Sequence, residues 1–178
     1  MISLVFAFYI FVILFAIIGS MRGWGKEVLV SFSVILALGF IAVIEDLLPY
    51  TNDMFQGGSM SQFWMRSGIL LVMVFFGYQS PKLSQFARFN ERSDRVQDFL
   101  LGLLFGAING YLIFGTLWYF MDEAGYPFSP AISAPAVVPS SVETAERLLN
   151  SFAPAILSGY WIYVAVVVAF VFVLVVLI

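Results

Sequence analysis

The residues best suited to chemistry lie close together in one short segment, residues 19–27. Gly19, Arg22, Gly23 and Glu27 form the pattern G-x-x-R-G-x-x-x-E. The glycines allow a tight reversal of the chain, Arg22 can bind lipid headgroups, and Glu27 complements the positive end of a following helix. An ordinary hairpin with its positive charge on the cytoplasmic side would explain the arginine but not the whole spacing. We therefore take this segment as the first candidate for a functional site.

The residue types available for catalysis are few. The chain contains neither cysteine nor histidine. Disulfides, thiol nucleophiles, imidazole bases and most zinc or haem ligation are therefore excluded. Catalysis by carboxylates alone is possible in principle, but no pattern in the sequence looks like the active site of an enzyme. We expect a protein that is not an enzyme and that carries no cofactor and no metal.

The composition indicates a protein whose natural solvent is lipid. Hydrophobic residues make up 62% of the 178 residues and charged residues only 11%, whereas a soluble domain usually carries about 25% charged residues. The formal net charge of −3 provides no basic footprint for nucleic acid, so we expect no nucleic-acid partner. The length suits a single membrane domain, residues 1–178, with no separate soluble domain.

Apolar runs predict an all-α integral membrane protein, a bundle of about five transmembrane helices. About 20 apolar residues are needed to cross a hydrocarbon core of about 30 Å. A signal peptide is the rival interpretation of the first run, but that run lacks a basic start and a small-residue cleavage site. The first four helices are expected to form the core and the last to be added to it. The expected helices cover residues 2–20, 28–48, 63–79, 99–121 and 155–178.

The third of these runs is the weakest, because it is solidly apolar only over residues 69–76. Reaching the length of a span means including residues 63–65 and Arg66. The Arg66 side chain would then extend to the lipid headgroups. The alternative is a tilted helix that lies partly in the interface.

The segments between the runs are polar. Lys82, Arg88, Arg92 and Arg95 could contact the phosphates of lipid headgroups if their segment rests on the bilayer surface. A solvated connecting loop explains the same residues equally well. The segment 122–151 is expected to be aqueous, and the helical spacing of apolar residues in its second half predicts a short amphipathic helix against the membrane.

The distribution of basic residues predicts the topology. Residues 21–27 hold two of the eight lysines and arginines, and residues 80–97 hold four more. Because positive charge is retained on the cytoplasmic side, both segments are expected there, with the N-terminus outside. The C-terminus is then inside if the last run spans. Cysteines introduced at positions 24 and 90 should resist an impermeant thiol reagent from outside.

Small and polar residues mark the fourth expected helix. Gly102, Gly106 and Gly110 recur every four residues and leave a groove that another backbone can approach, although glycine is also simply tolerated in membrane helices. Asn109 is the one strongly polar residue deep inside a span. It predicts an interhelical hydrogen bond, with a substrate contact as the alternative. No ionisable residue or proline lies at the centre of an expected span, which disfavours a transporter.

With these features the sequence resembles the colicin V production (CvpA) family of bacterial inner-membrane proteins. The hairpin pattern matches the most recognisable pattern of that family, and residues 98–110 are similar to its glycine-rich fourth helix. Residues 150–157 are similar to the segment that follows it, so the resemblance covers roughly residues 1–157. The opening helix lacks the acidic residue often seen near its start in the family, and the valine-rich last helix is additional to the usual four.

The resemblance implies a multi-pass protein of the bacterial inner membrane that supports toxin export or envelope homeostasis without catalysis. One alternative is a small structural or accessory subunit of a larger, energy-transducing membrane complex. A channel or carrier is a less favoured alternative. The expected partners are the lipid bilayer and other proteins bound through transmembrane helices, as a homo-oligomer or a larger complex. The abrupt apolar end at Ile178 suggests a longer parent chain.

Overall fold

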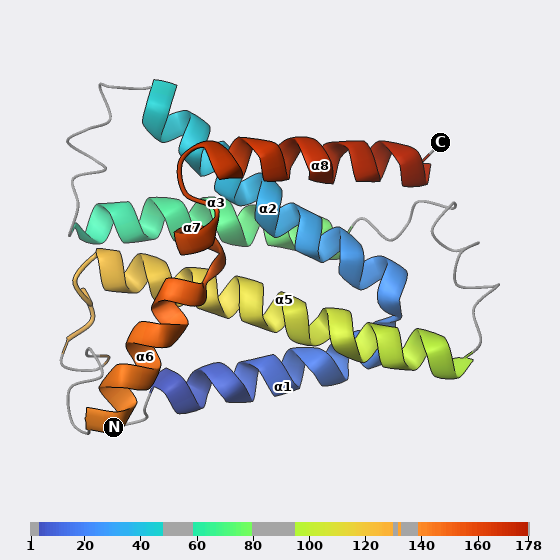
Figure 1. Ribbon diagram of the computed structural model, residues 1–178, viewed down its shortest axis with the longest axis horizontal. Coiled ribbons are helices and arrows are strands. Elements are labelled where there is room, and N and C mark those ends of the chain that lie inside the picture. The colour runs from blue at the N-terminus through green and yellow to red at the C-terminus, as the bar shows by residue number, and fades with distance from the viewer. Residues whose placement is uncertain (1–3, 48–58, 80–94, 130–131, 133–138, 178) are drawn as a thin grey trace.

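The computed structural model describes residues 4–47, 59–79, 95–129, 132 and 139–177. Within these ranges every regular element is an α-helix (Figure 1). In chain order the helices are α1 (Leu4–Arg22), α2 (Trp24–Leu47), α3 (Met60–Gln79), α5 (Arg95–Glu123), α6 (Pro139–Ser151), α7 (Ala153–Ile156) and α8 (Tyr160–Leu177).

The helices form an all-α membrane bundle, which confirms the predicted fold class. Among the described residues, α1, α2, α3 and α5 are long and apolar enough to cross a membrane, and α8 is a shorter apolar helix. Figure 1 shows these five helices lying lengthwise, with α1 and α2 running in opposite directions, as do α3 and α5. The amphipathic α6 crosses one end of the bundle, and α7 connects it to α8.

The centre of the bundle is the apolar contact between α2, α3 and α5. Val30, Val34, Ala37 and Leu70 are completely buried there. The outward faces are also apolar, and large side chains such as Phe6 are mostly exposed. A helix that is apolar on every side is typical of a lipid environment, because lipid tails cover the face that the protein does not.

Helices α1 and α5 approach each other closely along the glycine spacing that the sequence displays. A Cβ atom added to Gly106 would lie 2.9 Å from the Cα atom of Gly19, and one added to Gly102 would lie 2.5 Å from the carbonyl oxygen of Gly19. Farther along, a Cβ atom on Gly110 would lie 2.9 Å from the Cα atom of Val12. Side chains at these positions would hold the two backbones apart, so glycine is what permits the contact.

The chain reverses sharply after α5. Gly125 and Tyr126 both adopt positive φ angles, of 69° and 55°. The Tyr126 amide donates to the carbonyl oxygen of Met121 at 2.9 Å, which satisfies an acceptor at the end of the helix. The Tyr126 side chain is buried beside Trp118, and its hydroxyl accepts a hydrogen bond from the Trp118 indole at 3.2 Å. Burial raises the pKa of Tyr126 to about 12, so its hydroxyl stays protonated at physiological pH.

The amphipathic helix that the sequence predicts is α6, and part of its apolar side packs on the bundle. Ala145 is 2% exposed, and Phe152, just after the helix, is completely buried. The Phe152 ring lies 5.3 Å from the ring of Phe8 and 5.6 Å from that of Trp118. A Cβ atom on Gly115 would lie 2.6 Å from the Phe152 ring, so α5 leaves room for this residue.

Helix α3 covers the third apolar run. It is a continuous helix of 20 residues that begins at Met60, and by length and composition it qualifies as a span. Arg66 lies within this helix and pairs with acidic residues of two neighbouring helices. Its side chain is only 13% exposed because it pairs with two carboxylates, Glu45 at 2.7 Å and Glu123. Sequence reasoning did not predict these partners, which lie near the ends of α2 and α5.

Candidate functional site

The hairpin between α1 and α2 is much tighter than a seven-residue loop. Helix α1 continues to Arg22 and helix α2 begins at Trp24, so Gly23 alone joins them. Gly23 has a φ angle of 87°, which an L side chain rarely adopts, and its amide donates to the carbonyl oxygen of Gly19 at 3.0 Å. This is the usual geometry of a helix that ends at a glycine. The sequence needs a glycine at position 23 for this reason.

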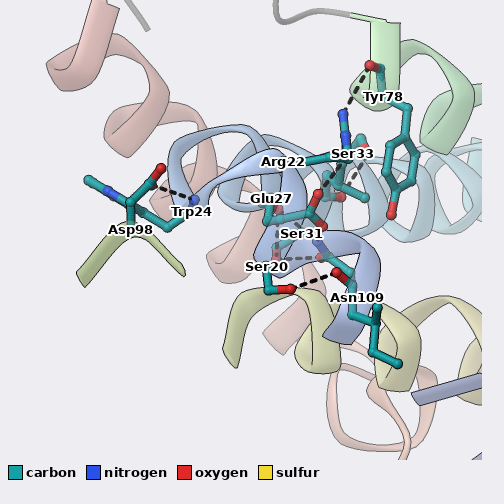
Figure 2. Close-up of polar contacts among 11 residues, drawn as sticks. Ser20, Arg22, Trp24, Glu27, Ser31, Ser33, Tyr78, Asp98 and Asn109 are labelled. Carbon is teal, nitrogen blue, oxygen red and sulfur yellow. Dashed lines mark hydrogen bonds and ion pairs between the residues drawn. The ribbon is translucent and has the colours of Figure 1, made fainter. Parts of the chain in front are cut away.

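The two charged residues of the hairpin pattern pair with each other (Figure 2). The Arg22 Nη1 atom lies 2.5 Å from the Glu27 Oε1 atom. The Glu27 side chain is completely buried, whereas that of Arg22 is 22% exposed. A buried carboxylate needs a partner, because an isolated charge loses its hydration without compensation. Glu27 is therefore more than a charge that complements the start of α2, which was the expectation.

Arg22 also connects the hairpin to α3. Its second terminal nitrogen donates to the carbonyl oxygen of Tyr78 at 3.2 Å, near the end of that helix. The guanidinium lies over the Tyr78 ring, 4.2 Å from the ring centre. A carbonyl in the last turn of a helix lacks a partner within the helix, and the ring face attracts a cation. One side chain thus stabilises the contact between the hairpin and α3.

Asn109 joins the same network from the middle of α5. Its amide nitrogen donates both to the backbone carbonyl oxygen and to the Oε2 atom of Glu27, each at 2.8 Å. Its amide oxygen accepts a hydrogen bond from the hydroxyl of Ser31 at 2.7 Å. Asn109 is completely buried. The Glu27 carboxylate therefore has a different donor on each oxygen, Arg22 on one and Asn109 on the other.

A second contact fixes the start of α2 against the start of α5. The backbone amide of Trp24 donates to the Oδ1 atom of Asp98 at 3.2 Å. The first amides of a helix have no partner within it, so a carboxylate from a neighbouring helix can cap them and favours the positive end of the helix. The hairpin is therefore tied to α5 by Asp98, by Asn109 and by the glycine contact described above.

These contacts bring together the two sequence patterns singled out from the chain. The hairpin pattern meets Gly102, Gly106 and Asn109 of α5, while Gly110 packs farther along α1 against Val12. Gly19 touches the glycine face and Glu27 binds Asn109. Ser31, Tyr78 and Asp98 also belong to the network, but sequence reasoning did not select them. Their partners are distant in the sequence and leave no local signal.

The remaining predicted positions concern lipid headgroups. Lys82, Arg88 and Arg92 lie outside the described residues. Arg95 begins α5 and is exposed. The start of α5 lies at the same end of the bundle as the hairpin (Figure 1).

The opposite end of the bundle holds a second ion-pair network that the sequence did not reveal. Arg66 bridges Glu45 of α2 and Glu123 of α5, and its guanidinium lies 5.5 Å from the centre of the Phe120 ring. Beside it, the Tyr163 hydroxyl of α8 donates to Asp46. One sequence feature could have indicated this network. A single arginine lies within the third apolar run, and acidic residues lie at the ends of the second and fourth runs.

No protein-family model, curated protein or solved structure matches the chain. Membership of the CvpA family therefore stays a prediction from the hairpin pattern and the glycine-rich helix.

We expect the replacement of Asn109 by leucine to weaken the contact between α2 and α5. The change removes three hydrogen bonds and leaves a Glu27 oxygen without its donor. Hydrogen bonds between membrane helices contribute about 0.6 to 1.7 kcal/mol each, so we expect a loss of about 2 kcal/mol in the free energy of unfolding. Titration with sodium dodecyl sulfate in mixed micelles measures it. The exposed Asn150→Leu is the control, and equal stability of the two variants would contradict the network.

Proposed function

We propose that this chain is a CvpA-like membrane protein that supports toxin export or envelope homeostasis and does so without catalysis. The observation that carries the proposal is the contact between the two segments on which the resemblance depends. The hairpin pattern places its glycine on the glycine face of α5 and its glutamate on Asn109 of the same helix. Segments that are about 80 residues apart in the sequence thus share one buried site.

The chemistry of the site favours a scaffold over a catalyst. The Glu27 carboxylate is completely buried and both its oxygens are engaged. A general base must reach a substrate proton, and a buried, fully paired carboxylate is poorly placed to do so. The network is better suited to holding the hairpin in one conformation against α3 and α5. The exposed residues around the hairpin then form a surface of constant shape. In the predicted topology this surface faces the cytoplasm.

A deletion strain tests this proposal. We expect loss of the gene to reduce export of a peptide toxin or survival under detergent stress, and the wild-type chain to restore it. Glu27→Gln should restore it poorly, whereas the matched Glu143→Gln, which lies in an exposed ion pair on α6, should restore it fully. A deletion strain with unchanged export and unchanged envelope resistance would refute the proposal.

The native particle distinguishes this function from that of an accessory subunit. A stand-alone protein should migrate as a small homogeneous particle after gentle solubilisation from its own membrane. It should also persist when genes for neighbouring complexes are deleted. Co-migration with a large redox complex, and loss of the chain when that complex is missing, would favour the accessory subunit instead.

The proposed orientation can be tested with single cysteines, because the chain has none of its own. Gln79 ends α3 near the hairpin and Ser129 follows α5 at the opposite end, and both residues are exposed. We expect Ser129→Cys to react with an impermeant thiol reagent added to intact spheroplasts, and Gln79→Cys to react only after permeabilisation. Labelling in the reverse order would overturn the assignment of the hairpin to the cytoplasm.

A further inference from the structure

A cavity of about 250 Å³ lies at the end of the bundle opposite the hairpin. Helices α2, α3 and α5 form three of its sides, and the segment from α7 into α8 closes another. One wall is apolar and includes Leu38, Ile41, Leu157 and Ile162. The other carries the second ion-pair network. A cavity that combines an apolar wall with a few convergent charges is the usual form of a small-molecule site.

The charges that line the cavity do not balance. Glu45, Asp46 and Glu123 contribute three carboxylates, and Arg66 contributes the one guanidinium among the lining residues. Three negative charges against one positive charge leave a net charge of −2. Arg66 is only 13% exposed and engages one oxygen of Glu45 and one of Glu123, so the second oxygen of each carboxylate can still accept a hydrogen bond. The Glu45 and Glu123 side chains are 28% and 38% exposed and remain accessible.

We propose that this cavity binds a small organic ammonium ion. The ammonium group donates hydrogen bonds to the carboxylates of Glu123 and Asp46, and the hydrocarbon part lies against Ile41 and Ile162. Tyr119 also lines the cavity, and the face of an aromatic ring attracts a cation. A bare metal ion would not fit as well, because the apolar wall cannot replace its hydration shell.

This proposal does not depend on the proposed function, because the cavity and the hairpin site lie at opposite ends of the bundle. A protein that supports envelope homeostasis and one that serves as a subunit could both carry the cavity. The carboxylates lie on the side that the predicted topology places outside, so the ligand would arrive from that side.

Titration calorimetry on the full chain in dodecyl maltoside, a neutral detergent without ammonium groups, tests the proposal. The probe is n-butylammonium chloride, and sodium butyrate and sodium chloride are the matched salts. We expect saturable binding of butylammonium and none of butyrate. Asp46→Asn keeps an acceptor for the Tyr163 hydroxyl but removes one charge from the cavity. It should weaken binding about tenfold, which corresponds to about 1.4 kcal/mol.

Two further variants separate the role of the cavity from general effects of charge and folding. Glu143→Gln removes the same charge from the exposed face of α6 and should leave the affinity unchanged. Ala42→Leu fills part of the cavity without changing any charge and should also weaken binding. Equal binding of butyrate, equal weakening by Glu143→Gln, or no saturable heat with a well-folded wild-type chain would each overturn the proposal.

Discussion

Replacing Glu27 with alanine is expected to cost the protein about 3 kcal/mol of unfolding free energy, since removing one partner of a buried ion pair typically costs about 3–5 kcal/mol. The lower end applies because Arg22 is 22% exposed and can partly regain water. The change also leaves the Asn109 amide without its carboxylate acceptor. Titration with sodium dodecyl sulfate, followed by tryptophan fluorescence, measures the loss.

Two comparisons show whether this loss comes from the buried site. Glu27→Gln keeps an acceptor but removes the charge, so we expect an intermediate loss. Glu143→Ala breaks an ion pair whose side chains are 66% and 76% exposed, and exposed pairs contribute only about 0.2–1 kcal/mol. If Glu27→Ala were no more destabilising than Glu143→Ala, the pairing of Glu27 would contribute little to the fold.

The replacement of Gly106 by leucine is expected to separate α1 from α5. Even the first added carbon would lie 2.9 Å from the Cα atom of Gly19 and 3.1 Å from that of Ala16. Both neighbours are backbone atoms, which cannot move aside as a flexible side chain can. Overpacking usually costs about 1–3 kcal/mol, and we expect a loss of about 3 kcal/mol here. Size-exclusion chromatography and the denaturation midpoint measure the effect.

Gly68 of α3 provides the matched control for this substitution. A Cβ atom added to Gly68 meets nothing within 4 Å, so Gly68→Leu changes helix propensity and lipid contact without steric conflict. We expect it to leave stability unchanged or to raise it by up to about 1 kcal/mol, because glycine disfavours helix by that amount. If Gly106→Leu and Gly68→Leu changed the free energy of unfolding equally, the glycine face would have no packing role.

Much of the fold could be predicted from the apolar runs, because lipid imposes a simple rule on composition and length. The residues at which the helices begin and end were less predictable. In the expected loop 21–27 only Gly23 is not helical, since the two residues before it end α1 and the four after it begin α2. Glu27 therefore sits inside α2 and turns inward, a placement that depends on α5 and not on neighbouring residues.

The partners within the site could not be read from the sequence. Asn109 predicts a hydrogen bond between helices, but the bond joins residues separated by 82 positions. The glycine spacing likewise predicts a close contact without naming α1 as the partner. The contact of α6 with the bundle could not be predicted for a related reason. Its apolar residues fit a membrane surface and a protein surface equally well, and the aromatic cage around Phe152 decides between them.

The most direct test of the hairpin site is a double-mutant cycle on Glu27→Ala and Asn109→Leu. Both substitutions damage the same network, so the double variant should lose less stability than the sum of the two single losses. We expect a coupling energy of at least about 1 kcal/mol, within the range of about 0.5–3 kcal/mol seen for residues in contact. Additive losses, within about 0.5 kcal/mol, would contradict the account, because they would mean that the hairpin and the glycine-rich helix do not form one site.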